Sequence, residues 1–385
     1  MKRTFEGNLV CMHRPQLHET VLVTGGAGFI GSHLADELLS HSYRVRAFDS
    51  LVDQVHSNGD RPEYLDREVE LVYGDIRDRE AVGRALVGVD AVVHFAARVG
   101  VGQSMYEIVD YAAANTQGTA VLLEAILDHP IRKLLVASSM SVYGEGAYET
   151  VDGEGVVVER SPEQLGEGIW DVLDDGGRPL RPVATPETKQ LALSSVYALT
   201  KYDQERLCLM FGRAYEIPAV ALRFFNTYGT RQALSNPYTG VLAIFASRLL
   251  NGKPPLVFED GRQLRDFVSV SDVVRACRLA LERDEANGHA LNIGTGRGVT
   301  VLEVAEKLAR VLDVDVDAEV VGKFRAGDVR HCFADASLAR ELLGFTARVE
   351  LEQGMAGLAE WLESQIAEDH VDGAAAELAV RGLTR

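Results

Sequence analysis

The sequence predicts an α/β protein that consists of a doubly wound parallel sheet of the Rossmann type and a smaller C-terminal α+β substrate domain. Three observations support this expectation. Short apolar runs alternate with segments of helical spacing, a glycine-rich turn follows the first run at residues 20–24, and the alternation becomes less regular beyond Asn226. Strands that alternate with helices favour a parallel sheet covered by helices on both faces.

The composition is that of a globular protein. The chain has 385 residues, enough for two packed domains, and its 46% hydrophobic and 25% charged residues exclude a disordered chain. Its net charge of -18 offers no basic face, so we expect no nucleic-acid partner.

The cysteines and the first residues bear on the compartment. Cys11, Cys208, Cys277 and Cys332 form no CxxC pair, so we expect neither a disulfide framework nor a metal site. Residues 1–19 lack the apolar core of a signal peptide, and no 18 consecutive residues are apolar. The sequence therefore predicts a cytoplasmic protein that does not span a membrane.

The elements of the first part follow one another in strict alternation. Every predicted strand is a short apolar run, and every predicted helix has apolar residues at helical spacing. We expect strands over 20–24, 44–49, 70–73, 91–95, 133–137 and 219–224, and helices over 29–39, 78–87, 105–129 and 195–215.

One long stretch interrupts the alternation. Residues 145–190 are rich in Gly, Pro, Asp and Glu, and they predict an insertion or lid because the alternation resumes after them. Thr300 and Glu303 have the spacing of a capping box and predict the start of a later helix. The polar, Ala-rich end of the chain predicts a loose helix or a disordered tail. We therefore predict a first domain over 20–225 with its insertion at 145–190, a second domain over 226–363, and tails at 1–19 and 364–385.

The turn TGGAGFIG, at residues 24–31, has the pattern of a phosphate-binding turn. Gly25, Gly28 and Gly31 lie between the first strand and the first helix. Glycines let the backbone approach a pyrophosphate closely, and the amino end of the helix offers it free N–H groups. A tight turn without a ligand is the alternative.

Acidic residues end the next two strands. Asp49 can accept hydrogen bonds from both hydroxyls of a ribose and would repel a 2′-phosphate, which favours NAD over NADP. Asp75, in the run GDI, ends the third strand, where a side chain could meet the adenine. A solvated acid at a strand end is the alternative for Asp49, and a plain turn is the alternative for the GDI segment.

Tyr197 and Lys201 lie four residues apart in a predicted helix and so share one of its faces. A free tyrosine has a pKa of about 10, and a nearby ammonium and a nicotinamide cation would lower it toward the working pH. Ser139 follows the fifth strand, at the edge where parallel sheets bind ligands, and could hydrogen-bond a sugar hydroxyl that loses its proton. A solvated helix face and a turn serine are the alternatives.

Together these segments resemble the extended short-chain dehydrogenase/reductase family over about residues 20–363. The matching segments occur in the family's order: TGGAGFIG, the strand end at Asp49, GDI at 74–76, HFAA at 94–97, NTQG at 115–118, SSMSVYG at 138–144, YALTK at 197–201, RFFNTYG at 223–229 and RDFVSVSDV at 265–273.

The resemblance implies NAD as the cofactor and Ser139, Tyr197 and Lys201 as catalytic residues. Tyr197 would take the proton of a sugar hydroxyl while the same carbon gives its hydride to the nicotinamide, and Lys201 would also hold the nicotinamide ribose. The residues expected to bind the cofactor are Gly25, Gly28, Phe29, Ile30, Gly31, Asp49, Asp75, Ile76, Phe95, Ala96, Ala97, Asn115, Tyr197, Lys201 and Phe224.

The resemblance also implies a nucleotide-diphosphate sugar as the substrate. Arg265 and Arg325 are expected at the diphosphate, because guanidinium groups match phosphate oxygens, although a surface salt bridge is the alternative for each. The other residues expected to bind the substrate are Asn226 of the RxFN motif, Asp328 of the RxGD motif, and Leu256 and Phe258 of a strand that stacks on the base.

Relatives differ in the step that follows the first oxidation. Sugar 4,6-dehydratases place an Asp-Glu pair where this chain has Met140 and Ser141, and related decarboxylases and 3,5-epimerases place a glutamate or a cysteine at the position of Ser141. Without a second acid or base, the simplest outcome is return of the hydride to the opposite face, which is 4-epimerisation.

Several segments resemble dTDP-L-rhamnose 4-epimerases most, although Thr230 stands where a proline is usual. UDP-glucose and UDP-glucuronate 4-epimerases are the alternatives, followed by a dehydratase or dehydrogenase of the same family and a non-catalytic NAD-binding protein. The predicted helices at 105–129 and 195–215 resemble the pair through which such enzymes form homodimers, so we expect a homodimer.

Overall fold

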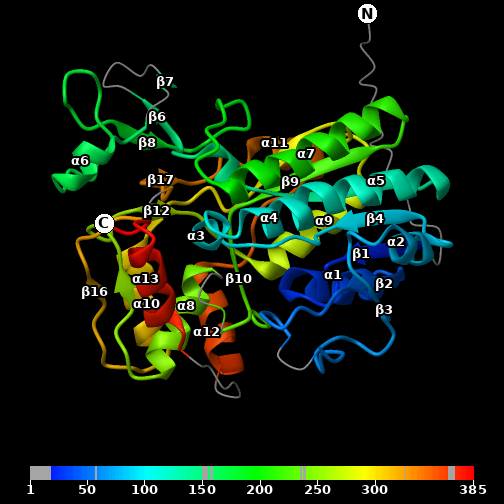
Figure 1. The fold of residues 1–385 in the computed structure, drawn as a ribbon, viewed down its shortest axis with the longest axis horizontal. Helices are drawn as coiled ribbons and strands as arrows, with labels where there is room; N and C mark the ends of the chain where they lie inside the picture. Colours follow the sequence, from blue (N-terminus) through cyan, green and yellow to red (C-terminus); the bar gives the residue numbers. More distant parts are fainter. Residues whose placement is uncertain are drawn as a thin grey trace, which may run out of the picture.

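The centre of the molecule is a seven-stranded parallel sheet (Figure 1). The structure is a computed structural model that describes residues 19–56, 59–149, 155–156, 159–234, 236, 240–325, 327–362 and 369–385. The predicted N-terminal tail lies, except for Glu19, outside the described residues.

The strand order β14-β9-β5-β4-β1-β2-β3 confirms the predicted doubly wound sheet, and all neighbouring strands are parallel. The strand order reverses at β1: β2 and β3 lie on one side of it, and the chain then crosses over to β4 on the other side. At such a switch point a crevice opens at the carboxyl ends of the strands. The strands are β1 (Thr20–Thr24), β2 (Arg44–Asp49), β3 (Glu70–Tyr73), β4 (Ala91–His94), β5 (Lys133–Ser139), β9 (Ala219–Phe224) and β14 (Ala290–Ile293).

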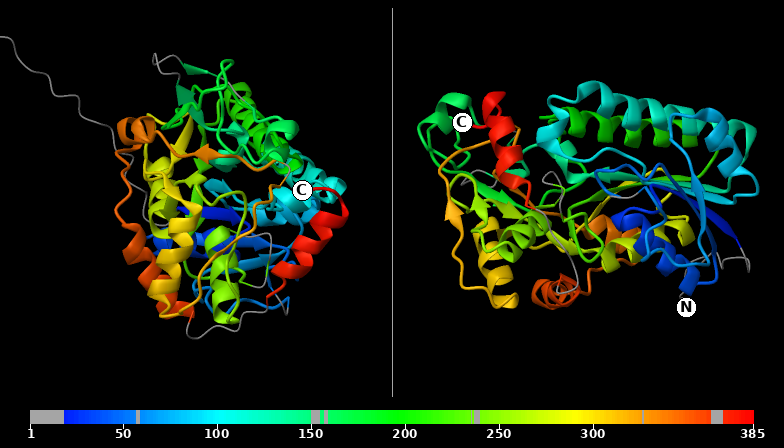
Figure 2. Two further views of the ribbon diagram at one scale, coloured as in Figure 1. Left: turned by 90° about the vertical axis from the view of Figure 1, so that its left-hand side faces the viewer. Right: turned by 60° about the horizontal axis from the view of Figure 1, so that its bottom comes forward.

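Helices cover both faces of this sheet (Figure 2). Successive residues of β1 alternate between two apolar cores, with Val21 and Val23 in one and Leu22 in the other, as the period of a strand requires. The first core holds α1 (Phe29–Ser40), α9 (Val270–Glu282) and α11 (Ser337–Leu343), and the second holds α2 (Arg79–Leu86), α5 (Gly118–Asp128) and α7 (Val196–Ala214).

The helix predicted over 105–129 is not continuous. It is divided into α4 (Ile108–Tyr111), a π-helical turn η1 (Ala112–Gln117) and α5, and a short helix α3 (Val101–Ser104) precedes it. A π-helical turn inserts one extra residue into the helix, and such turns are frequent at functional sites. The apolar spacing alone did not reveal this break.

The second part of the chain forms the expected α+β arrangement around a third core. Helices α8 (Val241–Leu250), α10 (Val301–Val311) and α12 (Leu351–Leu362) contribute to this core, and Thr300 Oγ1 accepts a hydrogen bond from Glu303 N at 3.1 Å, as the capping spacing predicted. Short strands surround it: β10 (Asn226–Tyr228), β11 (Leu256–Val257), β12 (Leu264–Arg265), β13 (Phe267–Ser269), β15 (Val299–Thr300), β16 (Glu319–Val320) and β17 (His331–Cys332).

The chain returns to the large sheet after β13. Helix α9 packs on α1, and β14 forms the edge strand beside β9. The predicted boundary at 225–226 therefore separates these elements in sequence but not in space. None of the helices in the described ranges is long and apolar enough to cross a membrane.

The predicted insertion forms a small unit of its own. A 3-10 turn η2 (Met140–Tyr143) leads into an antiparallel sheet with the order β7-β6-β8, followed in sequence by regular structure again at α7. Its core consists of Tyr148, Val172 and Leu180. The elements of the insertion are β6 (Ala147–Glu149), β7 (Gly155–Val156), α6 (Pro162–Gly166) and β8 (Arg181–Val183).

Buried ion pairs join the insertion to the second part of the chain. Arg160 donates to Glu145 at 3.0 Å and to Glu259 at 2.7 Å, and Arg330 donates to Glu259 at 3.1 Å and to Asp171 at 2.9 Å. The side chains of Arg160, Glu145 and Glu259 are 3%, 7% and 2% exposed. Charges at such depth are tolerated only when they are paired, so this contact fixes the insertion in place.

We predict that Arg160→Met lowers the free energy of unfolding by about 3–5 kcal/mol, because it leaves two buried carboxylates without this partner. Urea denaturation followed by circular dichroism measures the loss. Arg178→Met is the matched control, since Arg178 of the same insertion pairs with Asp174 through an exposed guanidinium. Equal losses of unfolding free energy from the two substitutions would show that the buried ion pairs stabilise the protein no more than the exposed pair does.

Candidate active site

The glycine turn has the geometry that only glycine permits. Gly25 has a φ of +69°, and a Cβ there would lie 2.9 Å from Ala96 N, while a Cβ on Gly31 would lie 2.2 Å from Gly25 O. A Cβ on Gly26, which sequence analysis did not single out, would lie 2.6 Å from Val23 O. No described side chain caps the start of α1 at Gly28, so the first N–H groups of this helix can bind an anionic ligand. Phe29 and Ile30, the first residues of α1, are half-buried.

Asp49 lies directly beside this turn. Its carboxylate accepts hydrogen bonds from Ala27 N and Leu51 N, both at 3.0 Å. A carboxylate offers about four acceptor positions, so two remain for the hydroxyls of a ribose. The geometry agrees with the proposed contact of Asp49 with the cofactor.

The two side chains of the GDI segment, Asp75 and Ile76, have different surroundings. Asp75 is half-buried and pairs with Arg77 at 2.5 Å, and the hydrogen bond from Arg77 lowers the pKa of the Asp75 carboxyl. Ile76 is buried against α5, where a Cβ on Gly118 would lie 2.5 Å from its Cγ2. Ile76 therefore packs helix against sheet, and Arg77 is a neighbour that the sequence analysis did not weigh.

The end of β4 is held by Asn115 of the π-helical turn. Asn115 Oδ1 accepts from Arg98 N at 2.7 Å, and its Nδ2 donates to Arg98 O at 3.1 Å and to Thr200 Oγ1 of α7 at 2.9 Å. The Phe95 ring packs edge-on against Phe224 with the centroids 5.9 Å apart. Asn115 thus supports the loop through its side chain, and the half-buried residues Phe95, Ala96 and Ala97 lie along that loop.

The structure brings Ser139, Tyr197 and Lys201 together. Ser139 ends β5 and Tyr197 lies in the first turn of α7, whose start is capped by Ser195. The Ser139 hydroxyl forms a hydrogen bond with Tyr197 that lowers the pKa of the phenol. Lys201 follows one helical turn later and is 4% exposed.

The electrostatics of the pair differ in part from the expectation. Burial raises the pKa of Tyr197 to about 12, and the hydrogen bond from Ser139 offsets only part of this rise. Burial also lowers the pKa of Lys201 to about 7, against opposing contributions of Cys208 and Glu205. The lysine is therefore only partly charged near neutral pH, and the groups that shift the pKa of Tyr197 are burial and Ser139, with no contribution from Lys201.

A buried network that sequence analysis missed holds Lys201. Its Nζ donates to Gln204 Oε1 at 2.8 Å, and Gln204 Nε2 lies 3.0 Å from both His94 Nε2 and Thr119 Oγ1. His94 Nδ1 lies 2.7 Å from Thr24 Oγ1, at the end of β1 and next to the glycine turn. Burial lowers the pKa of His94 to about 3, so this imidazole is neutral. No spacing in the sequence indicates these contacts, because their partners come from four separate elements.

Four of the six predicted substrate residues meet at one point. The Arg325 guanidinium lies 4.5 Å from the centroid of the Phe258 ring and donates to Asp328 at 2.8 Å, and Arg265 donates to Asp328 at 3.2 Å. Burial raises the pKa of the Asp328 carboxyl, but Arg325 and Arg265 outweigh this effect and bring it to about 2.

The two arginines have different surroundings. Arg265 is buried and also donates to the carbonyls of Leu264, Val329 and Arg330, so its N–H groups are largely taken by the protein. The Arg325 side chain is 42% exposed. Arg265 therefore donates mainly to backbone carbonyls, whereas Arg325 is the more accessible of the two.

Asn226 has an unusual environment. Its backbone N–H donates to Asp266 O at 2.9 Å, but its side-chain Oδ1 is buried and has no hydrogen-bond partner among the described residues. Buried polar atoms are rarely left unpaired, so this oxygen is a candidate for a ligand contact. Leu256, in β11, is half-buried two residues before Phe258.

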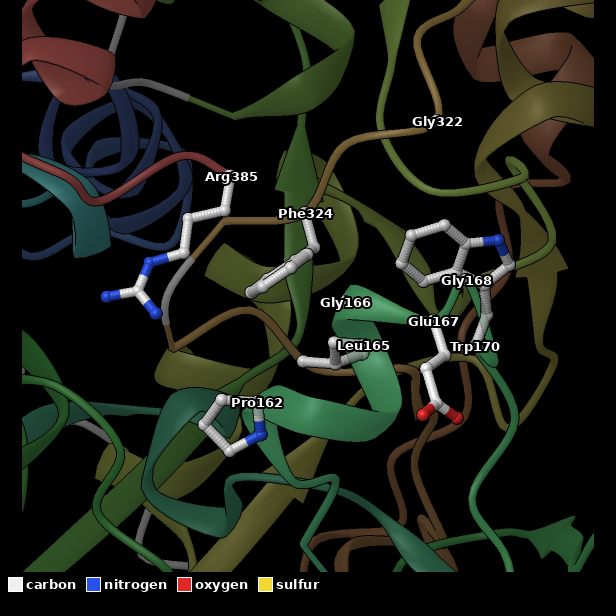
Figure 3. A pocket seen from close by; sticks show the side chains of 9 residues that line it. All are labelled: Pro162, Leu165, Gly166, Glu167, Gly168, Trp170, Gly322, Phe324 and Arg385. Carbon is white, nitrogen blue, oxygen red and sulfur yellow. The ribbon is translucent and has the colours of Figure 1, made fainter.

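A separate cavity of ≈ 540 Å³ lies between the insertion and the segment before Arg325 (Figure 3). It contains none of the predicted site residues, so we do not identify it with the active site. Its lining consists of Pro162, Leu165, Gly166, Glu167, Gly168, Trp170, Gly322, Phe324 and Arg385. Among the described residues, no three His, Cys, Asp or Glu side chains come together to hold a metal ion.

We predict that Lys201 makes stability rise with pH. The ordinary lysine pKa is 10.5 and burial lowers it to about 7 in the native state, so between these values the unfolded chain binds more protons than the folded one. Between about pH 7 and pH 9 the protein should gain about 2 kcal/mol of unfolding free energy relative to Lys201→Met. Denaturant titrations of both proteins at the two pH values measure the difference. Parallel changes in the two proteins would refute a lowered lysine pKa.

Comparison with known proteins gives consistent relatives. A dTDP-L-rhamnose 4-epimerase from Burkholderia thailandensis is 36% identical over 352 residues, which cover 90% of this chain and 95% of that protein. The UDP-glucose 4-epimerase of Homo sapiens is 31% identical over 373 residues, which cover 89% and 96% of the two chains.

Solved structures agree with these relatives. A UDP-glucose 4-epimerase from Thermotoga maritima, solved with UDP-glucose, has a TM-score of 0.74 at 33% identity and covers 89% of this chain and 98% of its own. A UDP-glucuronic acid 4-epimerase from Bacillus cereus, solved with UDP-glucuronic acid and NAD, has a TM-score of 0.73 at 27% identity, with 89% and 99% covered.

The family profile described as "NAD dependent epimerase/dehydratase family" matches residues 21–162 and 174–294, which include the glycine turn, Ser139, Tyr197 and Lys201. The gap in this match falls within the predicted insertion. The match confirms the predicted resemblance and the predicted cofactor, and the chain belongs to the NAD dependent epimerase/dehydratase family.

Proposed function

We propose that this chain is an NAD-dependent nucleotide-sugar 4-epimerase, which oxidises the sugar transiently at C4 and returns the hydride to the opposite face. The observation that carries the proposal is the interaction of Ser139, at the carboxyl end of β5, with Tyr197, which lies one helical turn before the buried Lys201. The family match and the 4-epimerases among the relatives support it.

NAD, when bound along the glycine turn, supplies the acceptor of the hydride and later its donor, so no net oxidant is consumed. Tyr197 takes the proton of the C4 hydroxyl as the C4–H bond breaks, and it returns this proton when the ketone is reduced. Ser139 would hydrogen-bond the same oxygen, and Lys201 would hold the nicotinamide ribose. Gly25 and Gly31 would let the pyrophosphate approach, and Asp49 would bind the second ribose.

The nucleotide end of the substrate would lie at the cluster of Phe258, Arg325 and Asp328. Arg325 would bind the diphosphate, because its exposed guanidinium is the one available to phosphate oxygens. Asn226 would use its unpaired oxygen to accept a hydrogen bond from the substrate. We propose dTDP-L-rhamnose as the substrate, with UDP-glucose and UDP-glucuronate as alternatives.

The segment after Ser139 argues against a dehydratase. Ser141 stands at a position where a member of the dehydratases would have a carboxylate, and its hydroxyl donates to Ser139 Oγ at 2.9 Å. A hydroxyl in this contact orients Ser139 but provides no acid or base for a second proton transfer.

We predict that Tyr197→Phe lowers kcat by about a hundredfold or more, because it removes the only proton acceptor assigned to the C4 hydroxyl. A panel of dTDP- and UDP-sugars, with products identified by NMR, measures turnover and stereochemistry. Tyr215→Phe is the matched control, since Tyr215 caps the end of the same helix and is 55% exposed. Retained turnover in Tyr197→Phe would contradict the mechanism, and steady accumulation of NADH at 340 nm would indicate a dehydrogenase instead.

We also propose a cytoplasmic homodimer. Apolar side chains lie exposed on the helices that the sequence assigned to an interface: Ile108 (52%), Val109 (79%), Leu127 (45%), Leu199 (46%) and Met210 (50%). The cysteines at 208, 277 and 332 are free and buried, as suits a reducing compartment.

We predict a mass of about 84 kDa by light scattering, twice the 42.0 kDa of one chain. Leu199→Asp combined with Met210→Asp should give the monomer mass, because two charges would lie in the apolar contact. Val320→Asp, at an exposed position on β16, should keep the dimer. A wild-type protein of monomer mass would refute the proposed assembly.

A further inference from the structure

We propose that residues 369–385, which we call the C-terminal strap, position the residues that would bind the nucleotide in the active site. The strap holds the described residues 324, 325, 327 and 328, which include Arg325 and Asp328 and which we call the nucleotide grip. It also contacts the segment that follows β4. The inference rests on the proposed function, because it assigns a role to residues beside the proposed nucleotide site. Three contacts of the strap carry it.

The first contact fixes the root of the strap. Asp369 lies 2.7 Å from Lys253 Nζ and 3.6 Å from Arg248, and Asp372 lies 2.6 Å from Arg248 Nη1. The side chains of Asp369 and Arg248 are 3% and 5% exposed, so the pair is shielded from water and from salt. Helix α13 (Val371–Val380) therefore starts from a fixed point at the end of α8.

The second contact reaches across to the NAD-binding part. Leu378 of α13 is buried against α3, where a Cβ on Gly102 would lie 3.3 Å from its Cδ2. The Arg381 guanidinium lies 4.2 Å from the centroid of the Tyr106 ring. Figure 2 shows α13, in red, beside the cyan segment that holds α3. The end of the chain that the sequence predicts as a loose helix or a disordered tail is thus a docked helix.

The third contact is backbone pairing with the nucleotide grip. Phe324 N donates to Arg385 O at 2.9 Å, and Arg385 N donates to Phe324 O at 3.0 Å. Arg325 forms an antiparallel bridge with Thr384. Figure 3 shows Phe324 and Arg385 side by side.

The loop is held from its other side as well. Gly327 has a φ of +78°, and a Cβ there would lie 3.0 Å from Ser194 O and 3.9 Å from Val101 Cγ1. Ser194 lies just before α7, the helix that carries Tyr197. The loop with Arg325 is therefore enclosed between the strap on one side and the residue before α7 on the other.

This enclosure has an energetic consequence. Apart from the bridge to Thr384, the described residues of this loop belong to no helix or strand, and ordering such a backbone on binding would cost conformational entropy. When the strap orders the loop in advance, this entropy is not lost when the substrate binds. The affinity for the nucleotide therefore rises, while the chemistry at the sugar is unaffected.

The test is Leu378→Asp, which places a charge against α3 and undocks the strap. We expect the Kd for dTDP and UDP, measured by calorimetry, to rise about tenfold, and the KM for the sugar nucleotide to rise in parallel at constant kcat and constant NAD content. Amide exchange at Phe324, whose N–H bonds to Arg385, should accelerate. Leu378→Met should keep the wild-type Kd and KM, because methionine fills the same apolar contact.

Val380→Asp is the matched control, since it introduces the same charge on the solvent side of the same helix, at a side chain that is 88% exposed. Equal Kd values for Leu378→Asp and wild type, or equal losses from Leu378→Asp and Val380→Asp, would overturn the strap while leaving the proposed function intact. A wild type that binds neither dTDP nor UDP would overturn the proposed function and the strap's role together.

Discussion

The proposed site depends on the close packing of the glycine turn against the start of α1. A side chain on Gly31 would lie 2.2 Å from Gly25 O, so the turn can close only without one. This closure aims the uncapped end of α1 at the crevice between β1 and β4. The position of Asp49, which bonds to the backbone of the turn, and the network from Thr24 to Lys201 both depend on it.

The catalytic pair illustrates a conflict between packing and chemistry. Burial alone moves the pKa of Tyr197 upward and the pKa of Lys201 downward, so it favours the uncharged form of each. A phenolate must therefore be stabilised by groups that approach the hydroxyl directly, and Ser139 is one of them. Gln204 opposes the cost for the lysine by accepting its hydrogen bond. Such a site lowers the stability of the folded protein and gains reactivity, as active sites commonly do.

The sequence predicted the large sheet, its glycine turn and the residues Ser139, Tyr197 and Lys201, because each depends on local spacing. Apolar runs specify buried strands, and a glycine pattern specifies a turn. It did not predict the break in the helix at η1, the partners of Lys201, or the ion pairs of Arg160. These arise from contacts between residues far apart in the chain, and no local pattern encodes which polar side chains will meet there. The docking of α13 belongs to the same class, because Leu378 and the ion pairs of Asp369 and Asp372 join it to residues far away in the chain.

The local balance of charge, and not the net charge, explains how an acidic protein could bind a diphosphate. The chain carries a net charge of -18, yet Arg265 and Arg325 share the single carboxylate of Asp328, which stays ionised because its pKa is about 2. This group of three side chains therefore retains one positive charge. Other N–H groups of Arg265 donate to backbone carbonyls. The guanidinium of Arg325, over the face of the Phe258 ring, therefore carries the excess positive charge. A base and a diphosphate could then be recognised at one place, with the aromatic ring on one side and the guanidinium on the other.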